Sequence, residues 1–548
     1  MKRDIDLLAT KTYDLLIIGG GIYGAALARE AALSGLSVTL VDQGDFGAAT
    51  SANSLKIIHG GLRYLQQLDL PRLRQSLRER RCLMRLGPHL VHPLPCALPT
   101  QGWALKSRAA MFCGLKLNNW LGWDRNRGLP PEKKNPPGRV GSRAEWLRIA
   151  PDLDDSRYTG VALWHDAYAY NTERLVLGFI QAAVEAGAQA ANYVEVTGFQ
   201  KRGRNVTGAT AVDRLTGRSL AIPARLTVIN TGPWTRQTLN LLGENVAGPK
   251  FRLALAMNLV LRRQLIPRYA VGLTTRSEGW KTSRLFFFVP WRERTMVGTY
   301  LRPHEGRAES LKVTEDDIRA FIASLNQAYP GANLQLADIA FVQAGLLPAK
   351  DEDVAPGAEP RLLNHFQIID HARADGIGGL MTVLGVKYTT ARDVAQRTMQ
   401  RVAAKLGRAA SQTPAERPPL PGGDFADLDQ LIAEAAATGM PRERAKRLVY
   451  NYGAGYSAVL QLGGAEKSLL APVSAKAEVI GAEIVHAVRH EMAVTLADVA
   501  LRRTELGSAG APDDLALRNT AALIAQELLW NEARAHKEIE EVKGLRYG

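Results

Sequence analysis

Three glycines near the N-terminus have the spacing that holds a pyrophosphate. Gly19, Gly21 and Gly24 follow the apolar residues 15–18 and lead into a helical run. In such a turn the first glycine permits a tight bend, the second lets a pyrophosphate approach the backbone, and the third lets helix and strand pack closely. The phosphates then lie at the helix N-terminus, where free N–H groups bind anions.

The elements around this turn complete the motif. A second strand, residues 37–41, ends at Asp42, whose carboxylate can accept the ribose hydroxyls of a dinucleotide. Strand, turn, helix, strand and acid follow in order, so we predict a dinucleotide-binding βαβ unit and not a glycine-rich turn without a ligand. The segment alone does not separate NAD from FAD.

A long polar stretch follows the second strand. Its polar and glycine residues include Thr50, Ser51, Ser54, Lys56, His59, Gly60, Gly61, Arg63 and Tyr64. Ordinary connections between strand and helix have roughly two to six residues, so a stretch of this length must line something. We predict that it lines the cofactor site.

From this stretch onward the chain resembles the FAD-dependent glycerol-3-phosphate dehydrogenases, the quinone-linked flavoenzymes of respiratory membranes. The matching motifs are ATSxxSxKxIHGGLRYL (residues 49–65), NTGPW (230–234), FVPW (288–291) with Gly298-Thr299, GxKxTTxR (385–392), and AVRHEMA (487–493) with RRT (502–504). They span nearly the whole chain. The resemblance implies FAD as the cofactor and an α/β fold, with an FAD-binding Rossmann-like domain, an antiparallel-sheet substrate domain and a C-terminal all-helical domain.

The resemblance also implies roles for single residues. It adds these residues to the cofactor site: Thr231, Gly232, Gly385, Thr389 and Thr390. Lys387 resembles the family's active-site lysine, and Arg63 with Tyr64 resembles its substrate-binding pair. His59 is a candidate base, with hydrogen bonding to cofactor or backbone as the alternative. The implied chemistry is removal of a hydride from a carbon that bears a hydroxyl or an amine.

Four positions depart from the family. Asn258 replaces an active-site histidine, Leu347 and Asn364 replace two substrate arginines, and Leu301 replaces an aspartate. Asparagine cannot act as a general base, and leucine cannot bind a phosphate. A phosphate dianion needs arginine or lysine clamps. We therefore expect glycerol 3-phosphate to be a weak substrate.

Three functions stay open on the sequence. The first is oxidation of glycerol 3-phosphate to dihydroxyacetone phosphate, with electrons passed to quinone. Its phosphate site would be rearranged, with charge from Arg63, Lys387 and the nearby Lys350 or Arg361. The second is a divergent paralogue that oxidises another polyol, a hydroxy acid or an amine. The third is a non-catalytic flavin-binding scaffold.

The length of 548 residues predicts two to four domains. We assign residues 1–410 to the oxidoreductase core, in which about 12–95, 160–250 and 340–410 bind FAD and about 96–159 and 251–339 form the substrate part. Residues 411–425 are predicted as a linker and 426–548 as a C-terminal helical domain. We expect that domain to support assembly or to close over the core, and we expect the core to keep FAD without it.

Charge and hydropathy predict the location and partners. The chain has no apolar run of about eighteen residues, and two acids interrupt the first six residues, so neither a membrane span nor a signal peptide is expected. The net charge of +15 attracts anionic lipid, whereas no nucleic-acid motif accompanies it. Residues 103–123 mix basic and aromatic side chains as an interfacial helix does, and an internally packed helix is the alternative. We expect a cytoplasmic protein, peripheral on the inner face of the cell membrane, with a homodimer as an open assembly. The three cysteines lack metal-site spacing, so no metal is expected.

Overall fold

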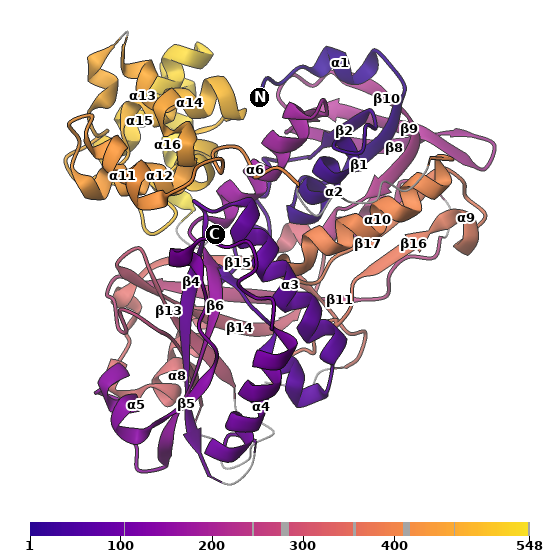
Figure 1. The fold of residues 1–548 in the computed structure, drawn as a ribbon. Helices are drawn as coiled ribbons and strands as arrows, with labels where there is room; N and C mark the ends of the chain where they lie inside the picture. Colours follow the sequence, from indigo (N-terminus) through magenta and orange to yellow (C-terminus); the bar gives the residue numbers. More distant parts are fainter. Residues whose placement is uncertain are drawn as a thin grey trace.

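The computed structural model describes residues 1–102, 105–243, 246–275, 284–353, 358–408, 417–464 and 466–545. Two sheets lie one below the other in Figure 1, and a cluster of helices from the C-terminal part packs beside them. The fold class is the predicted one: a Rossmann-like α/β part, a largely antiparallel second sheet and a helical C-terminal domain. The domain boundaries themselves stay predictions, because the linker at 411–425 lies partly outside the described residues.

The first sheet is built around the predicted βαβ unit. Its strands, in order, are β16 (Gln367–Asp370), β17 (Leu380–Leu384), β10 (Ser219–Ile229), β1 (Tyr13–Ile18), β2 (Val38–Val41) and β7 (Gln189–Ala191). All neighbours pair in parallel except β16, which pairs antiparallel with β17. The parallel strands therefore end at a common edge, where ligands bind in folds of this type.

Helices and a β-ribbon cover the two faces of this sheet. Helices α2 (Ile22–Ala32), α6 (Thr172–Glu185) and α10 (Ala391–Lys405) pack together on one face, where their alanine, leucine and valine side chains share a core with β1 and β2. On the other face, β8 (Val194–Arg202) and β9 (Asn205–Asp213) extend β10 as an antiparallel ribbon. Because both faces are covered, β1 is buried along its whole length.

The second sheet carries the predicted substrate part. Its strands, in order, are β15 (Ile339–Ala349), β11 (Arg252–Leu261), β14 (Arg294–His304), β13 (Leu285–Trp291), β12 (Ala270–Thr274), β4 (Val91–Gln101), β6 (Tyr158–Ala169) and β3 (Ile57–Ile58), with β5 (Arg139–Ser142) beside β6. Strands β13 and β14 form a hairpin. The chain reverses at Arg292 and Glu293, whose φ values are 49° and 60°.

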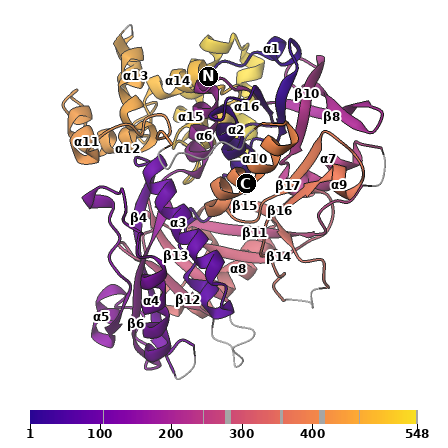
Figure 2. The same ribbon diagram turned by 45° about the vertical axis from the view of Figure 1, so that its right-hand side comes forward.

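The helices beside the second sheet differ in how many of their side chains they bury. Helices α5 (Arg143–Ile149) and α8 (Glu315–Ala328) bury Trp146 and Phe321 in its core. Helix α3 (Leu70–Leu86) lies in front of the second sheet in Figure 2, where it contacts β4, β6 and α10. Helix α4 (Arg108–Leu121) buries only Leu115.

The C-terminal part is helical wherever the structure describes it. Its helices are α11 (Leu428–Ala436), α12 (Arg442–Tyr452), α13 (Tyr456–Gln461), α14 (Gly481–Glu491), α15 (Asp514–Leu528) and α16 (Glu532–Gly544), together with a π-helix, η11 (Asp498–Arg503). None of the helices in the described residues has both the length and the apolarity that a membrane span requires.

Candidate active site

The carboxyl ends of the parallel strands open into a cavity of about 740 Å³. Twelve residues singled out in the sequence line it: Gly19, Gly21, Asp42, Thr50, Ser51, Ser54, His59, Thr231, Gly232, Gly385, Lys387 and Thr389. They come from the ends of β1, β2, β10 and β17 and from the long polar stretch. The topology thus gathers segments that lie hundreds of residues apart in the chain.

The glycines of the first turn are fixed by close backbone contacts. Gly19 has φ +108°, and a Cβ there would lie 2.6 Å from the carbonyl oxygen of Asn230. A Cβ on Gly24 would lie 1.9 Å from the carbonyl oxygen of Gly19, so Gly24 serves the packing of α2 on β1 and does not line the cavity. At Gly21 the nearest atom to a Cβ is Ser51 Oγ at 3.3 Å. Because Gly21 has no side chain, the N-terminus of α2 stays accessible from the cavity.

Asp42 is held at the end of β2 by two backbone donors. The N–H of Gly20 donates to its Oδ2 at 2.6 Å, and the N–H of Gly44 donates to its Oδ1 at 2.8 Å. Burial raises the pKa of this carboxyl to about 6. The carboxylate is thus oriented by the protein before any ribose hydroxyl reaches it.

Several predicted cofactor residues have other partners. The ammonium of Lys56 donates to Glu173 at 2.9 Å and to Thr172 at 3.0 Å, so it is turned away from the cavity into a buried ion pair. This departs from the prediction, since a buried ammonium needs a carboxylate partner. The N–H of Gly60 donates to Asp166 at 2.5 Å, and a Cβ on Gly61 would lie 2.7 Å from the ring of Tyr64. Thr390 donates to the carbonyl of Lys387 at 3.4 Å. These residues support the site from outside its lining.

Three basic side chains surround Tyr64 beside the cavity. Lys387 Nζ donates to the Tyr64 hydroxyl and lies 4.0 Å from the ring centroid. The guanidinium carbons of Arg72 and Arg63 lie 4.8 Å and 5.7 Å from the same centroid. Burial, together with the charges of Arg63 and Arg72, lowers the pKa of Lys387 to about 6. Lys387 is therefore largely neutral at pH 7 and can accept a proton.

Arg72 was not among the site residues predicted from the sequence. Its Nη2 donates to the carbonyl of Asn364 at 2.6 Å, and its Nε lies 3.3 Å from the Asp69 carboxylate. One signal was available: Asp69 followed by Pro71 is a helix start, and it sets Arg72 in the first turn of α3 next to Tyr64. The cluster thus has two charged arginines, Arg63 and Arg72, and the largely neutral Lys387 close to the carboxylate of Asp69.

The positions that depart from the family lie in different places. Leu347 lines the cavity, whereas Asn364 is exposed and Leu301 lies on β14. Asn258 is buried outside the lining, where it accepts from Thr299 Oγ1 at 2.9 Å. Lys350 and Arg361 were expected to replace lost charge, but neither belongs to the cavity lining; the exposed Arg361 faces Glu352 at 3.7 Å.

His59 faces the cavity as a neutral ring. Burial and the charge of Arg63 lower its pKa to about 4. Its Nδ1 is buried and has no hydrogen-bond partner among the described residues. The ring meets Tyr64 edge to face with centroids 6.0 Å apart. Both readings of His59, base or hydrogen-bond partner of the cofactor, are compatible with this placement.

The cavity fits a flavin dinucleotide. Buried polar atoms of His59, Asn230 and Gln237 line it without protein partners in the described part of the chain. Such atoms are costly unless a ligand satisfies them. The open helix N-terminus at Gly21 suits the pyrophosphate, and Asp42 suits the ribose.

Fold and site together define a flavin-dependent oxidoreductase. Residues 14–392 match the family model described as FAD dependent oxidoreductase, and residues 413–535 match the one described as C-terminal domain of alpha-glycerophosphate oxidase. The glycerol-3-phosphate dehydrogenase of Synechocystis sp. is 30% identical over 98% of this chain and 97% of its own length. The alpha-glycerophosphate oxidase of Streptococcus pneumoniae is 28% identical over 99% of this chain and 95% of its own.

A solved structure has the same fold. The glycerol-3-phosphate dehydrogenase of Bacillus halodurans complexed with FAD aligns with a TM-score of 0.75 over 99% of this chain and 96% of that one, at 24% identity. The protein therefore belongs to the FAD-dependent glycerol-3-phosphate dehydrogenase family, and its cofactor is FAD.

Proposed function

We propose that this enzyme oxidises glycerol 3-phosphate to dihydroxyacetone phosphate and passes the electrons to a quinone. The observation that carries the proposal is the pair of cations Arg63 and Arg72, which lie with neutral Lys387 beside the cavity and have Asp69 as their nearby carboxylate. An excess of positive charge at a half-buried site attracts a dianion. The names of the relatives support the same substrate.

The chain's own residues supply binding, orientation and a proton acceptor. Bound FAD supplies the hydride acceptor. Arg63 and Arg72 bind the phosphate oxygens of the substrate from beside the cavity, since they lie around Tyr64 and outside the lining itself. Neutral Lys387 takes the proton of the substrate hydroxyl as the carbon loses its hydride, so the product is a carbonyl and Lys387 becomes an ammonium. His59 then serves as a hydrogen-bond partner within the cavity.

The alternative substrate class depends on Leu347. An apolar side chain at this point of the cavity lining favours an uncharged group, so another polyol, a hydroxy acid or an amine is the second candidate. We expect Leu347→Arg to lower the KM for glycerol 3-phosphate about tenfold, because a charge-assisted hydrogen bond contributes roughly 1.5–3 kcal/mol. Steady-state kinetics on glycerol 3-phosphate and glycerol measure the effect.

Leu347→Met is the matched control, since it keeps an apolar side chain of similar volume. It should leave both KM values within about twofold. A wild-type enzyme that already has micromolar half-saturation for glycerol 3-phosphate would show that Arg63, Arg72 and Lys387 suffice, and the alternative class would then be dropped.

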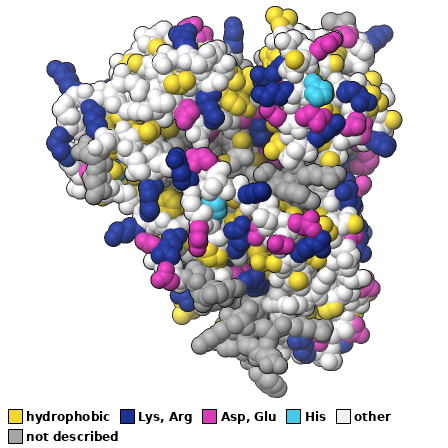
Figure 3. All heavy atoms as spheres, turned by 180° about the vertical axis from the view of Figure 1, so that it is seen from behind, with side chains coloured by type: hydrophobic (Ala, Val, Ile, Leu, Met, Phe, Trp, Pro, Cys, Tyr) yellow, Lys and Arg dark blue, Asp and Glu magenta, His cyan; other side chains and the backbone are white. Residues whose placement is uncertain are grey.

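We propose a peripheral membrane position through helix α4. Large apolar side chains are exposed along and beside it: Leu68, Leu105, Phe112, Trp120 and Trp123. Arg108 and Lys116 are exposed on the same helix. This arrangement supports the interfacial reading of residues 103–123 over internal packing, although 103 and 104 lie outside the described residues. On the face in Figure 3, which is seen from behind Figure 1, Lys and Arg are spread with acidic residues among them.

Removing the two exposed tryptophans should release the enzyme from lipid. Trp120 and Trp123 are 71% and 72% exposed, and burying each in a lipid interface is worth on the order of 1.5–3 kcal/mol. We expect Trp120→Ala with Trp123→Ala to weaken binding to anionic liposomes at least about tenfold in sedimentation assays. Leu529→Ala, at a side chain 90% exposed on the helical domain, is the control that should not change binding. Equal binding by the double variant would refute the assignment of α4.

A further inference from the structure

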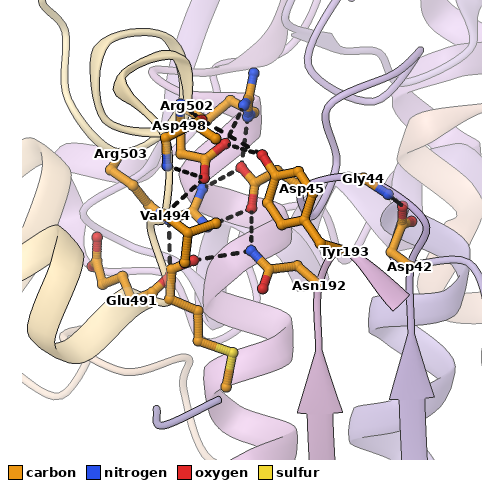
Figure 4. A network of polar contacts seen from close by, with 12 residues as sticks. Asp42, Gly44, Asp45, Asn192, Tyr193, Glu491, Val494, Asp498, Arg502 and Arg503 are labelled. Atoms are coloured by element: carbon orange, nitrogen blue, oxygen red, sulfur yellow. Dashed lines mark hydrogen bonds and ion pairs between the residues drawn. The ribbon is translucent and has the colours of Figure 1, made fainter. Parts of the chain in front are cut away.

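The loop that follows β2 lines the cofactor cavity and also meets the C-terminal domain. Asp42, Gly44, Asp45, Thr50 and Ser51 all contribute to the lining. Figure 4 shows Asp45 between this loop and residues of the C-terminal domain. The Asp45 carboxylate is fully buried, so its charge must be balanced inside the protein.

Two adjacent arginines of the C-terminal domain balance that charge. Arg503 donates through Nη2 to Oδ1 and through Nη1 to Oδ2, each at 2.7 Å, and Arg502 donates through Nε to Oδ2 at 2.6 Å. Asn192 adds a fourth donor at 3.0 Å. These arginines hold the pKa of Asp45 well below its ordinary value although burial alone would raise it. Neither arginine belongs to the cavity lining.

A π-helix brings both arginines to one carboxylate. η11 begins at Asp498, whose Oδ1 accepts from Arg502 Nη2 at 2.6 Å and from the Tyr193 hydroxyl at 2.7 Å. Tyr193 N–H in turn donates to the carbonyl of Gly44 at 3.0 Å. The π-helix, the segment at Tyr193 and the cavity loop are thus joined in one polar network. Single-turn π-helices occur frequently at functional sites.

A second buried ion pair ties the same region to the core. Arg174 of α6 donates to Glu491 at 2.7 Å and to the carbonyl of Arg503 at 2.8 Å. Arg503 Nε donates to the carbonyl of Glu491 at 3.0 Å. The position of Arg503 is therefore fixed from two sides, which presents its guanidinium to Asp45 in one orientation.

We propose that the C-terminal domain holds the cavity loop in its FAD-binding conformation through Arg502 and Arg503, which act as positioning residues on Asp45. Without them the buried carboxylate is uncompensated, and the loop must move to hydrate it. Because the same loop carries Asp42 and Ser51, that movement costs FAD affinity. The inference concerns cofactor retention and does not depend on which substrate is oxidised. It reverses the expectation that the core keeps FAD without the C-terminal domain.

The test measures FAD retention by the full-length holoenzyme. Release of FAD on dilution is followed by flavin fluorescence, and thermal unfolding is recorded beside it. We expect Arg502→Gln with Arg503→Gln to raise the Kd for FAD about tenfold or more. Arg502→Gln combined with Arg503→Lys keeps one of the two positive charges and should recover part of the loss. Tyr193→Phe removes the hydrogen bonds of this hydroxyl to Asp498 and Thr495 and leaves both arginines in place. It should give a smaller loss of FAD affinity in the same direction, and it tests the proposal if the double variant does not fold.

Arg447→Gln is the matched control. It breaks a buried ion pair with Glu483 that lies within the helical domain and makes no contact with Asp45. It should lower the unfolding temperature but leave the Kd for FAD within about twofold. The proposal is overturned if the double variant or Tyr193→Phe retains FAD as the wild type does, or if Arg447→Gln loses FAD to the same extent, since general destabilisation would then explain the effect.

Discussion

Gly21→Val should yield folded protein that is colourless as purified. The backbone at Gly21 has φ −71° and ψ 179°, which valine adopts without strain, and the nearest contact to a Cβ is 3.3 Å away. The added methyl groups instead occupy the cavity at the N-terminus of α2, where the pyrophosphate is expected. We expect FAD affinity to fall about a hundredfold or more, roughly 3 kcal/mol, measured by the visible absorbance of the purified protein.

Valine at two other glycines gives a control for this result and a more damaging comparison. Gly455→Val is the control, because φ there is −68° and no heavy atom lies within 4 Å of a Cβ. It should remain yellow. Gly19→Val should lose both flavin and fold, since its φ is +108° and the Asn230 carbonyl is 2.6 Å from a Cβ. Yellow Gly21→Val protein would mean that the turn does not hold the cofactor.

Replacing Lys387 should separate substrate binding from turnover. Lys387→Arg cannot accept a proton and carries a permanent charge, so kcat should fall about 100- to 10,000-fold while KM for glycerol 3-phosphate does not rise. Lys387→Gln cannot accept a proton either and lacks that charge, so its KM should be higher than that of Lys387→Arg. For the wild type, kcat/KM should decline as the pH falls through about 6, because protonation of Lys387 removes the acceptor. Retention of kcat within about tenfold by Lys387→Arg would assign the base elsewhere, with His59 the first candidate.

The site residues that could be predicted from the sequence belong to motifs formed by neighbouring residues of the chain. Gly19, Gly21 and Asp42 were found because a strand, a tight turn and a helix must follow one another closely in the chain to hold a dinucleotide. The other predicted residues that line the cavity were placed through the long polar stretch and through motifs shared with the family, whereas lining residues such as Val194, Arg214 and Gln237 were not predicted. Fold class was accessible for the same reasons.

The parts that were missed depend on contacts between distant segments. Nothing near Lys56 shows that Glu173, more than a hundred residues later, captures its ammonium. The packing of α3 next to Tyr64 positions Arg72. The Asp45 carboxylate, in the loop after β2, binds Arg503 of η11. The hairpin of β13 and β14 turns at Arg292 and Glu293 with positive φ and without glycine or asparagine, so its turn has no signal in the sequence.

The most direct test of the proposed function is anaerobic mixing of the yellow enzyme with glycerol 3-phosphate, followed by flavin absorbance. With oxygen and quinone absent, nothing reoxidises the reduced flavin, so its reduction by the substrate is seen as a lasting loss of yellow colour. We predict complete bleaching by stoichiometric glycerol 3-phosphate and none by glycerol at the same concentration, with dihydroxyacetone phosphate as product. Flavin that stays oxidised with every alcohol and amine tested would indicate a non-catalytic scaffold, and faster bleaching by an unphosphorylated compound would contradict the assigned substrate.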